Sequence, residues 1–459
     1  MFFSYLILVI MNEKQQLAVT TLGNVLLIAG AGSGKTFTII NKINYLIENN
    51  LYKENEILAI SFTNESVNDI KRKIKYNIDV KTFHKLALDL IRDDNTKIAK
   101  ESMLTFLIKE YLNKPQNKRQ KKIIRKILLE NTKDNLINLI STFINLYKAN
   151  YSNIDYLISL YKNAHFITKD YLLLIIEIYL LYQNELSSSG YLDFNDMISI
   201  STAKINNNEV KTKYKFVIID EFQDTSLIRF NLIKAIIDQN NGHLFAVGDD
   251  YQSIYRFSGC DLKILINLKD YLENLTIINL DYNYRNNQTL VNIANNFIMK
   301  NKKQIKKNTI CLKDTEKPIK IVFYKNEKTC LEKIITLIDG PILILGRNNK
   351  DKETFNVSET DNIKFLTIHK SKGLEEDNII IINLLNKTNS LPSKIKNHQI
   401  INLLSFKETI PYEEERRLFY VALTRTRNSA YLLVPYSNYS LFVKELIKEN
   451  KIDLEIIKL

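Results

Sequence analysis

Short apolar runs alternate with longer amphipathic stretches along much of the chain. In the first part, four of these runs have the length and composition of buried strands: Val25–Ala29, Ile57–Phe62, Tyr214–Asp220 and His243–Val247. Strands that are apolar on both faces are typical of a parallel sheet, and the stretches between them have the apolar spacing of helices. The pattern therefore predicts an α/β fold in which helices cover both faces of a parallel sheet.

The pattern changes between about Ala87 and Ser187, where long stretches are rich in Leu, Ile, Tyr and Lys and contain no Gly. We interpret residues 87–187 as a helical insertion within this first α/β region, which we call the first lobe. The insertion carries a basic run, Lys114–Lys126. Such a run is typical of a solvated helix face and equally of a surface that contacts phosphate groups, so both interpretations stay open.

A second α/β region begins near Thr276. Its expected strands are Ile319–Tyr324, Ile342–Leu345, Ile363–Ile368, Asn378–Ile382 and Ala430–Val434. We therefore predict two lobes, the first formed by residues 11–86 and 188–278 and the second by residues 279–459. The apolar residues 1–10 lack the basic start and the cleavage site of a signal peptide, so we interpret them as an N-terminal extension.

Charge and cysteine usage add two weaker indications. The chain has 64 Lys and Arg against 51 Asp and Glu, and its net charge of +13 favours a polyanionic partner. An AT-rich coding genome would produce much of the same excess, and this alternative stays open. The cysteines Cys260, Cys311 and Cys330 are far apart and no segment resembles a membrane span, so we expect no structural metal, no disulfide framework and a reducing, cytoplasmic location.

The segment AGAGSGKT follows a buried strand and precedes a helix, which is the context of the phosphate-binding loop in P-loop NTPases. Its glycines let backbone N–H groups approach the β- and γ-phosphates of ATP, while Lys35 supplies a positive charge and Thr36 a hydroxyl ligand for Mg²⁺. Ala29 stands where the strict GxxxxGK[ST] pattern has its first Gly. The residues expected to bind the nucleotide here are Ala29, Gly30, Ala31, Gly32, Ser33, Gly34, Lys35 and Thr36.

An acidic pair follows the predicted strand Tyr214–Asp220. Asp220 has the position of a carboxylate that orients Mg²⁺, and Glu221 can accept a proton from the attacking water. An isolated acidic pair at the end of a strand is usually only solvated. The phosphate loop around Lys35 makes the catalytic interpretation the stronger one.

At Asp220–Thr225, DEFQDT, the chain resembles superfamily 1 helicases of the UvrD/Rep type, those of the helicase IV type in particular. The resemblance extends from Met11 to about Leu446, and Val247–Asp261 (VGDDYQSIYRFSGCD) is its most distinctive segment. It implies two RecA-like lobes with ATP between them, and an ATP-dependent 3′–5′ DNA helicase or single-stranded DNA translocase in repair, recombination or replication. ATP and Mg²⁺ would be the cofactors and single-stranded and forked DNA the partners, with no need for an oligomer.

The same resemblance assigns further nucleotide contacts. The segment Asn12–Gln16 (NEKQQ) is similar to the adenine-reading segment of the family, which implies that Gln16 contacts the base. By the same comparison, Tyr284 would stack on adenine and Glu375 would bind the ribose.

Three residues are expected to reach the γ-phosphate by resemblance: Gln252, Arg285 and Arg425. Isolated arginines are usually surface charges. The motif context, NYR around Arg285 and EEERRLFYVALTRTR around Arg425, favours the catalytic role.

The residues expected to contact nucleic acid are Phe62, Thr63, Asn64, Thr82, His84, Tyr255, Phe257 and His369. By resemblance, Tyr255 and Phe257 would serve as stacking surfaces, each worth about 1–3 kcal/mol per base. The family usually has Trp where Phe257 stands. Taken singly, such aromatic residues are more often part of a core, and the motif context favours the binding role.

Two departures from the family affect unwinding. Arg347 and Thr367 lie 20 residues apart, which leaves no room for the large 2B subdomain of longer relatives. The segment Pro435–Ser440 is short for the strand-separating hairpin, with Tyr436 or Tyr439 as the candidate pin. Two alternatives therefore remain: a translocase that displaces proteins with little unwinding, and a nucleotide-switched binding module. The sequence also leaves open whether the nucleic acid is DNA or RNA, because stacking of single strands does not distinguish them.

Overall fold

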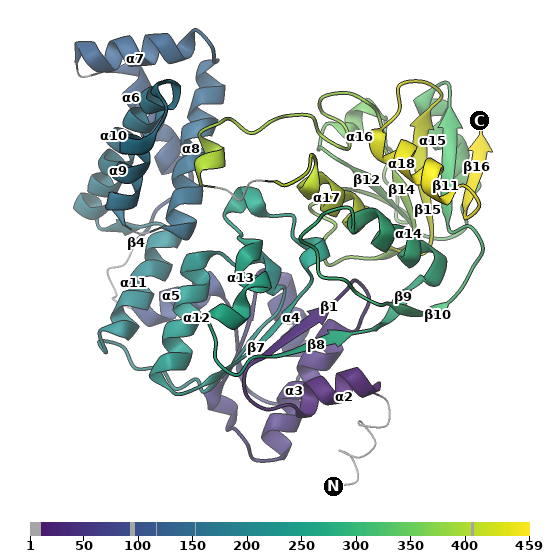
Figure 1. Ribbon diagram of the computed structural model, residues 1–459, viewed down its shortest axis with the longest axis horizontal. Coiled ribbons are helices and arrows are strands. Elements are labelled where there is room, and N and C mark those ends of the chain that lie inside the picture. Colours follow the sequence, from purple (N-terminus) through teal and green to yellow (C-terminus); the bar gives the residue numbers. More distant parts are fainter. Residues whose placement is uncertain (1–10, 92–96, 116, 152, 405–407) are drawn as a thin grey trace.

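The computed structural model describes residues 11–91, 97–115, 117–151, 153–404 and 408–459. It consists of two α/β lobes and a helical unit that projects from the first lobe (Figure 1). The expected N-terminal extension, residues 1–10, lies outside the described residues. Within the described part of the chain, no helix combines the length and hydrophobicity required to cross a membrane.

The first lobe is built on a six-stranded parallel sheet with the order β3-β2-β6-β7-β1-β8. Its strands are β1 (Val25–Ala29), β2 (Ile57–Ser61), β3 (Asp79–Thr82), β6 (Phe216–Ile219), β7 (His243–Gly248) and β8 (Thr276–Leu280). The second α/β region was expected to begin near Thr276, with the boundary between the lobes after residue 278. This placement is wrong because all of β8, from Thr276 to Leu280, pairs with β1 at the edge of the first sheet. Three of the five residues of β8 are exposed, so its pattern does not indicate which sheet it joins.

Helices cover both faces of this sheet because alternate residues of each strand point to opposite sides. Val25 and Leu27 pack with α3 and α4, whereas Leu26 and Ile28 pack with α5, α11, α12 and α13. The helices of this lobe are α2 (Glu13–Thr20), α3 (Lys35–Glu48), α4 (Asn64–Lys73), α5 (Phe83–Ile91), α11 (Phe194–Asn206), α12 (Leu227–Gln239) and α13 (Leu262–Ile266).

The helical unit has its own hydrophobic core. Its elements are β4 (Lys97–Ile98), α6 (Ser102–Asn113), α7 (Lys118–Leu128), α8 (Lys133–Asn150), α9 (Ile154–Asn163), α10 (Phe166–Ser189) and β5 (Tyr191–Leu192). Ala87 and Ile91 lie instead in the core of the first lobe, on α5. Ile400 and Ile401, which belong to the second lobe by sequence, are buried in the core of the helical unit. Figure 1 shows this crossing segment beside α8.

The second lobe has another six-stranded parallel sheet, with the order β13-β12-β14-β15-β11-β16. Its strands are β11 (Ile319–Tyr324), β12 (Ile342–Gly346), β13 (Ile363–Thr367), β14 (Glu376–Ile381), β15 (Thr426–Pro435) and β16 (Leu454–Lys458). Its helices are α14 (Gln288–Ile298), α15 (Glu327–Thr336), α16 (Asp351–Thr354), α17 (Glu413–Leu423) and α18 (Leu441–Asn450). Together the two sheets confirm the predicted α/β fold with two RecA-like lobes.

A two-stranded ribbon, β9 (Tyr282–Asn287) with β10 (Ile310–Lys313), connects the lobes. It runs between them in Figure 1 and carries the NYR motif past the phosphate-binding loop. The connection therefore places residues of the second half of the chain directly against the first lobe.

Candidate nucleotide cleft and nucleic-acid surface

The phosphate-binding loop joins the carboxyl end of β1 to the N-terminus of α3. Gly34 caps this helix with a φ of 81°, and Gly32 has a φ of 70°, a left-handed conformation that favours glycine. The carbonyl of Gly32 accepts a hydrogen bond from the N–H of Tyr284 at 2.8 Å. A Cβ atom at Gly32 would lie only 2.6 Å from that of Arg285, so the close approach of β9 to the loop requires glycine there.

The acidic pair after β6 faces this loop. The ammonium of Lys35 lies 3.0 Å from a carboxylate oxygen of Glu221, whose own N–H donates to Asp220 at 2.9 Å. Burial alone would raise the pKa of Glu221, but the charges of Lys35 and Lys372 lower it below its usual value. Glu221 is therefore held ionised beside the phosphate-binding loop.

Asp220 has the opposite electrostatic environment. Burial and the adjacent charge of Glu221 raise the pKa of Asp220 above its usual value. A bound divalent cation would reverse this effect by stabilising the carboxylate. Mg²⁺ prefers oxygen ligands, and the Asp220 carboxylate together with the Thr36 hydroxyl at the start of α3 forms a donor set of this kind.

Two arginines from the second half of the chain face the same cleft. Arg425 is almost fully buried, and its Nη2 donates to Oε1 of Gln252 on the first lobe at 2.8 Å. Burial, and then the nearby charge of Arg285, lower the pKa of Arg425 to about 9. Arg285 lies against Gly32 and donates through Nη1 to the carbonyl of Thr424 at 3.3 Å.

The glutamine that approaches the loop is Gln15, one residue before Gln16, which was expected to contact the base. Gln15 is buried and its Nε2 donates to the carbonyl of Ser33 at 3.4 Å, whereas Gln16 is exposed. The reason is local: Asn12 and Gln15 form a capping box at the start of α2, which turns Gln15 inward. The Nxx[EQ] spacing before α2 is a sequence signal that distinguishes the two glutamines.

Tyr284 and Glu375 flank the loop on the side of the second lobe. The ring of Tyr284 is 42% exposed, and its hydroxyl accepts a hydrogen bond from Nδ2 of Asn12 at 2.8 Å. The carboxylate of Glu375 is shared by Arg285 and Arg427. A ribose contact by Glu375 would require this carboxylate to exchange one of its arginine partners.

Part of the expected nucleic-acid surface forms an aromatic cluster across the lobes. The Tyr255 hydroxyl donates to the carbonyl of His369 at 2.9 Å, and the ring of Phe257 lies 5.6 Å from that of His369. Phe257 is 58% exposed. The cluster therefore joins the two lobes and offers one open aromatic face.

The remaining expected contacts lie along the first lobe and differ in exposure. Thr63, which caps α4, and Asn64 are exposed. Phe62 packs against Phe83 at 5.3 Å. His84 packs against Phe194 at 4.4 Å, and burial lowers its pKa to about 4. Thr82 is half-buried and accepts the N–H of Lys85 at 3.2 Å. Only part of this set is therefore free to stack or bind.

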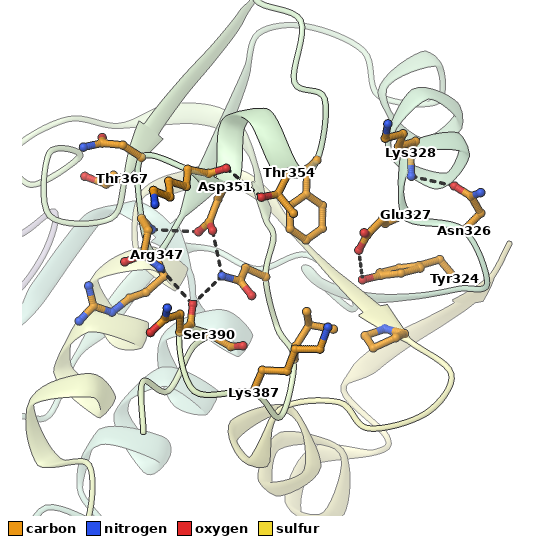
Figure 2. Close-up of a pocket in the computed structure, with 18 of the residues that line it drawn as sticks. Tyr324, Asn326, Glu327, Lys328, Arg347, Asp351, Thr354, Thr367, Lys387 and Ser390 are labelled. Atoms are coloured by element: carbon orange, nitrogen blue, oxygen red, sulfur yellow. Dashed lines mark hydrogen bonds between the residues drawn. The ribbon is translucent and has the colours of Figure 1, made fainter. Parts of the chain in front are cut away.

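A cavity of about 1340 Å³ opens at the carboxyl ends of β11, β12, β13 and β14, and sequence reasoning did not find it (Figure 2). Its lining includes Arg347, Thr367 and Lys387, which come from three separate segments. This is the edge of a parallel sheet at which ligands usually bind. A sequence signal was present, since the polar residues Arg347, Asn348 and Asn349 directly follow the apolar strand β12.

Sequence reasoning also missed Lys372, which links the lobes. Its ammonium lies 2.5 Å from Asp224 and donates to the carbonyl of Gln252 at 2.8 Å. Lys372 thus contacts both the DEFQDT segment and the segment that carries Gln252.

Comparisons with known proteins agree with this geometry. The UvrD/REP helicase N-terminal domain family matches residues 11–273, and the UvrD-like helicase C-terminal domain family matches residues 342–438. The ATP-dependent DNA helicase Rep of Buchnera aphidicola subsp. Schizaphis graminum is 32% identical over 70% of this chain and 49% of its own length. DNA helicase IV of Escherichia coli is 27% identical over 92% of this chain and 68% of its own length.

The ATP-dependent DNA helicase PcrA of Staphylococcus aureus is 30% identical over 63% of this chain and 40% of its own length. The chain thus spans about half the length of the Rep relatives that it matches. With a family match over more than half of its residues, this chain belongs to the UvrD/REP helicase family.

Proposed function

We propose that this protein is an ATP-dependent motor that moves along single-stranded DNA in the 3′ to 5′ direction and separates the strands of forked DNA. The observation that carries the proposal is the division of one cleft between two lobes. Lys35 and Glu221 lie on the first lobe, and Arg285 and Arg425 approach them from the second half of the chain. The names of the relatives, ATP-dependent DNA helicases, support the same activity and imply the polarity only by family resemblance.

Hydrolysis in such a cleft depends on its closure. An arginine supplied across an interface stabilises the charge of the phosphoryl-transfer transition state and accelerates hydrolysis by about 10³–10⁵-fold. Arg425 already bonds to Gln252 across the lobes, so ATP between them would compete for both side chains. ATP binding would draw the two lobes together, and hydrolysis would let them separate. The two lobes would thereby advance alternately along the DNA.

Each side chain at the nucleotide has a proposed task. Glu221 accepts the proton of the attacking water, and Gln15 with Tyr284 holds the adenine. Thr36 and Asp220 would hold Mg²⁺, which when bound neutralises charge between the phosphates. Because both halves of the cleft come from one chain, the activity does not require an oligomer.

The proposed path for the DNA follows the carboxyl edges of the two sheets. Phe257 offers an open ring beside His369, and the exposed Lys387 adds positive charge at the cavity of the second lobe, where Arg347 is paired with Glu415. Stacking on aromatic rings is tolerant of sequence, as a translocating protein requires.

A second candidate function is a translocase that removes proteins from DNA and unwinds poorly. It is favoured by the short segment Pro435–Ser440, where Tyr436 stacks on Phe323 at 5.7 Å instead of standing free as a pin. Only a short helix, α16, and β13, which ends at Thr367, lie between Arg347 and Thr367.

One experiment tests both candidates. Unwinding of 3′- and 5′-tailed DNA and RNA forks is measured together with ATP turnover and displacement of streptavidin from a biotinylated single strand. A helicase unwinds the 3′-tailed DNA fork, whereas a translocase displaces streptavidin but leaves the fork paired. If single-stranded DNA does not change ATP turnover, the result indicates a nucleotide-switched binding module. If the Lys35→Ala variant retains ATP turnover, the result contradicts the proposed ATP site.

A further inference from the structure

The loop after β7 carries Gln252. It belongs to the first lobe by sequence but packs against the second lobe. Tyr251 and Ile254 are fully buried in the hydrophobic core of the second lobe. The hydroxyl of Tyr251 donates to the sulfur of Met299 at 3.0 Å, just beyond α14. The second lobe is therefore in a position to control where Gln252 lies.

Lys307 lies in the segment between α14 and β10 and contacts this loop. Its side chain is only 6% exposed, and its ammonium contacts the carboxylates of Asp249 and Asp250, the latter at 2.6 Å. The same ammonium lies 3.5 Å from the centre of the Tyr251 ring. Both carboxylates are 0% exposed, so Lys307 is the buried counter-charge of an acidic pair.

Asp249 bonds to both Lys307 and Gln252 and so connects the two side chains. One of its oxygens accepts from Lys307, and the other accepts from Nε2 of Gln252 at 2.6 Å. A glutamine amide has distinct donor and acceptor ends. With its N–H₂ held by Asp249, Gln252 presents its oxygen to Arg425 at 2.8 Å. The orientation of this amide therefore depends on a chain of contacts that starts at Lys307.

We propose that Lys307 is a positioning residue for ATP hydrolysis: by neutralising Asp249 it fixes the orientation of Gln252 toward Arg425. The proposal rests on the proposed function, in which Gln252 and Arg425 meet the γ-phosphate. Without Lys307, two adjacent buried carboxylates would repel each other and leave their present positions. Gln252 would then lose its fixed orientation while the phosphate-binding loop stayed intact.

A purely structural ion pair would affect stability alone, and the chain contains a matched control for this case. Lys148 on α8 is 5% exposed and contacts Asp193 at 2.5 Å and Asp196 at 2.7 Å. Lys148 is about as buried as Lys307 and also contacts two carboxylates, which are 16% and 19% exposed, but neither of these partners belongs to the ATP cleft. Lys148→Met is expected to lower the melting temperature without a specific change in turnover.

The test is a double-mutant cycle on the ATP turnover of the full chain, with and without single-stranded DNA. Lys307→Met is expected to lower kcat about tenfold with little change in the KM for ATP, because the ATP-binding loop is untouched. Lys307→Arg, which keeps the charge, is expected to retain most of the turnover. In a Gln252→Ala background, Lys307→Met is expected to cause no further loss, since residues that act as one unit are not additive.

An equal fold-loss in both backgrounds would overturn the proposal, as would unchanged turnover in Lys307→Met or a loss matched by Lys148→Met. If Lys307→Met does not fold, Asp249→Asn takes its place in the same cycle, with the same expected non-additivity. Wild-type turnover that does not respond to DNA would contradict the proposed motor function. The cycle measured on DNA-independent turnover still decides whether Lys307 acts through Gln252.

Discussion

The ammonium of Lys372, on the second lobe, lies 2.5 Å from a carboxylate oxygen of Asp224, on the first. The two side chains are only 7% and 4% exposed. Burial raises the pKa of Asp224 to about 6, although the charge of Lys372 acts in the opposite direction. This pair is a direct and titratable link between the halves of the nucleotide cleft.

The link predicts a pH-dependent stability. A raised pKa in the folded state means that Asp224 stabilises the fold below its usual pKa, and this contribution is lost as the pH rises through about 6. The charge of Lys372 acts in the opposite direction but does not outweigh burial, because the pKa of Asp224 stays above its usual value. We therefore expect Asp224 to make the protein more stable at pH 5 than at pH 7, as a higher melting temperature at pH 5.

Asp224→Asn is the control for this prediction. It has no carboxyl group to titrate, so the variant is expected to lose this part of the difference in melting temperature between pH 5 and pH 7. The same difference in Asp224→Asn would show that other groups cause it.

Arg425 is expected to act on hydrolysis more than on ATP binding. Arg425→Ala should leave the affinity for a fluorescent ATP analogue near that of the wild type and lower kcat by about 10³-fold, because the arginine stabilises charge that develops in the transition state. Arg427→Ala is a neighbouring control, since Arg427 pairs with Glu375 and Asp377 and is 40% exposed. Lost affinity with unchanged hydrolysis in Arg425→Ala would contradict the assignment.

Gln15 and Gln16 provide an internal comparison on one helix. Gln15→Ala removes a buried polar group beside the phosphate-binding loop and is expected to raise the KM for ATP about tenfold, equivalent to about 1.4 kcal/mol. Gln16→Ala changes an exposed side chain and should leave the KM unchanged. Melting temperatures of both variants separate this effect from the loss of the capping box. A larger effect of Gln16→Ala would restore the assignment based on family resemblance.

The basic helix α7 is expected to bind phosphate groups at a distance from the ATP cleft. All six of its basic side chains are exposed. Lys126 is paired with Asp170, and the other five are Lys118, Arg119, Lys121, Lys122 and Arg125. We expect replacement of these five residues with Gln to weaken the salt dependence of forked-DNA binding. In a plot of the logarithm of the binding constant against the logarithm of salt concentration, the slope should become shallower by about 0.9 for each duplex phosphate that the helix no longer neutralises. Lys444 and Lys448, exposed on α18, serve as the control pair. An unchanged slope would identify α7 as a solvated face.

Most central strands could be predicted because they are apolar on both faces. β11 matches its predicted bounds, and β12 and β13 differ from theirs by one residue. In the two large sheets, the strands that were missed are β3, with the polar sequence DVKT, and β16, whose exposed residues alternate with others. Local hydrophobicity does not distinguish such edge strands from loops.

The sequence by itself determined the phosphate-binding loop and the acidic pair at Asp220, since each is a short run in which strand, loop and helix follow one another in the chain. Only the tertiary structure decided that Thr276 joins the first sheet, that Ile400 enters the core of the helical unit, and that Lys307 reaches Asp249. These contacts join residues far apart in sequence. Their partners are selected by packing and by charge neutralisation in buried space, neither of which leaves a periodic pattern in the chain.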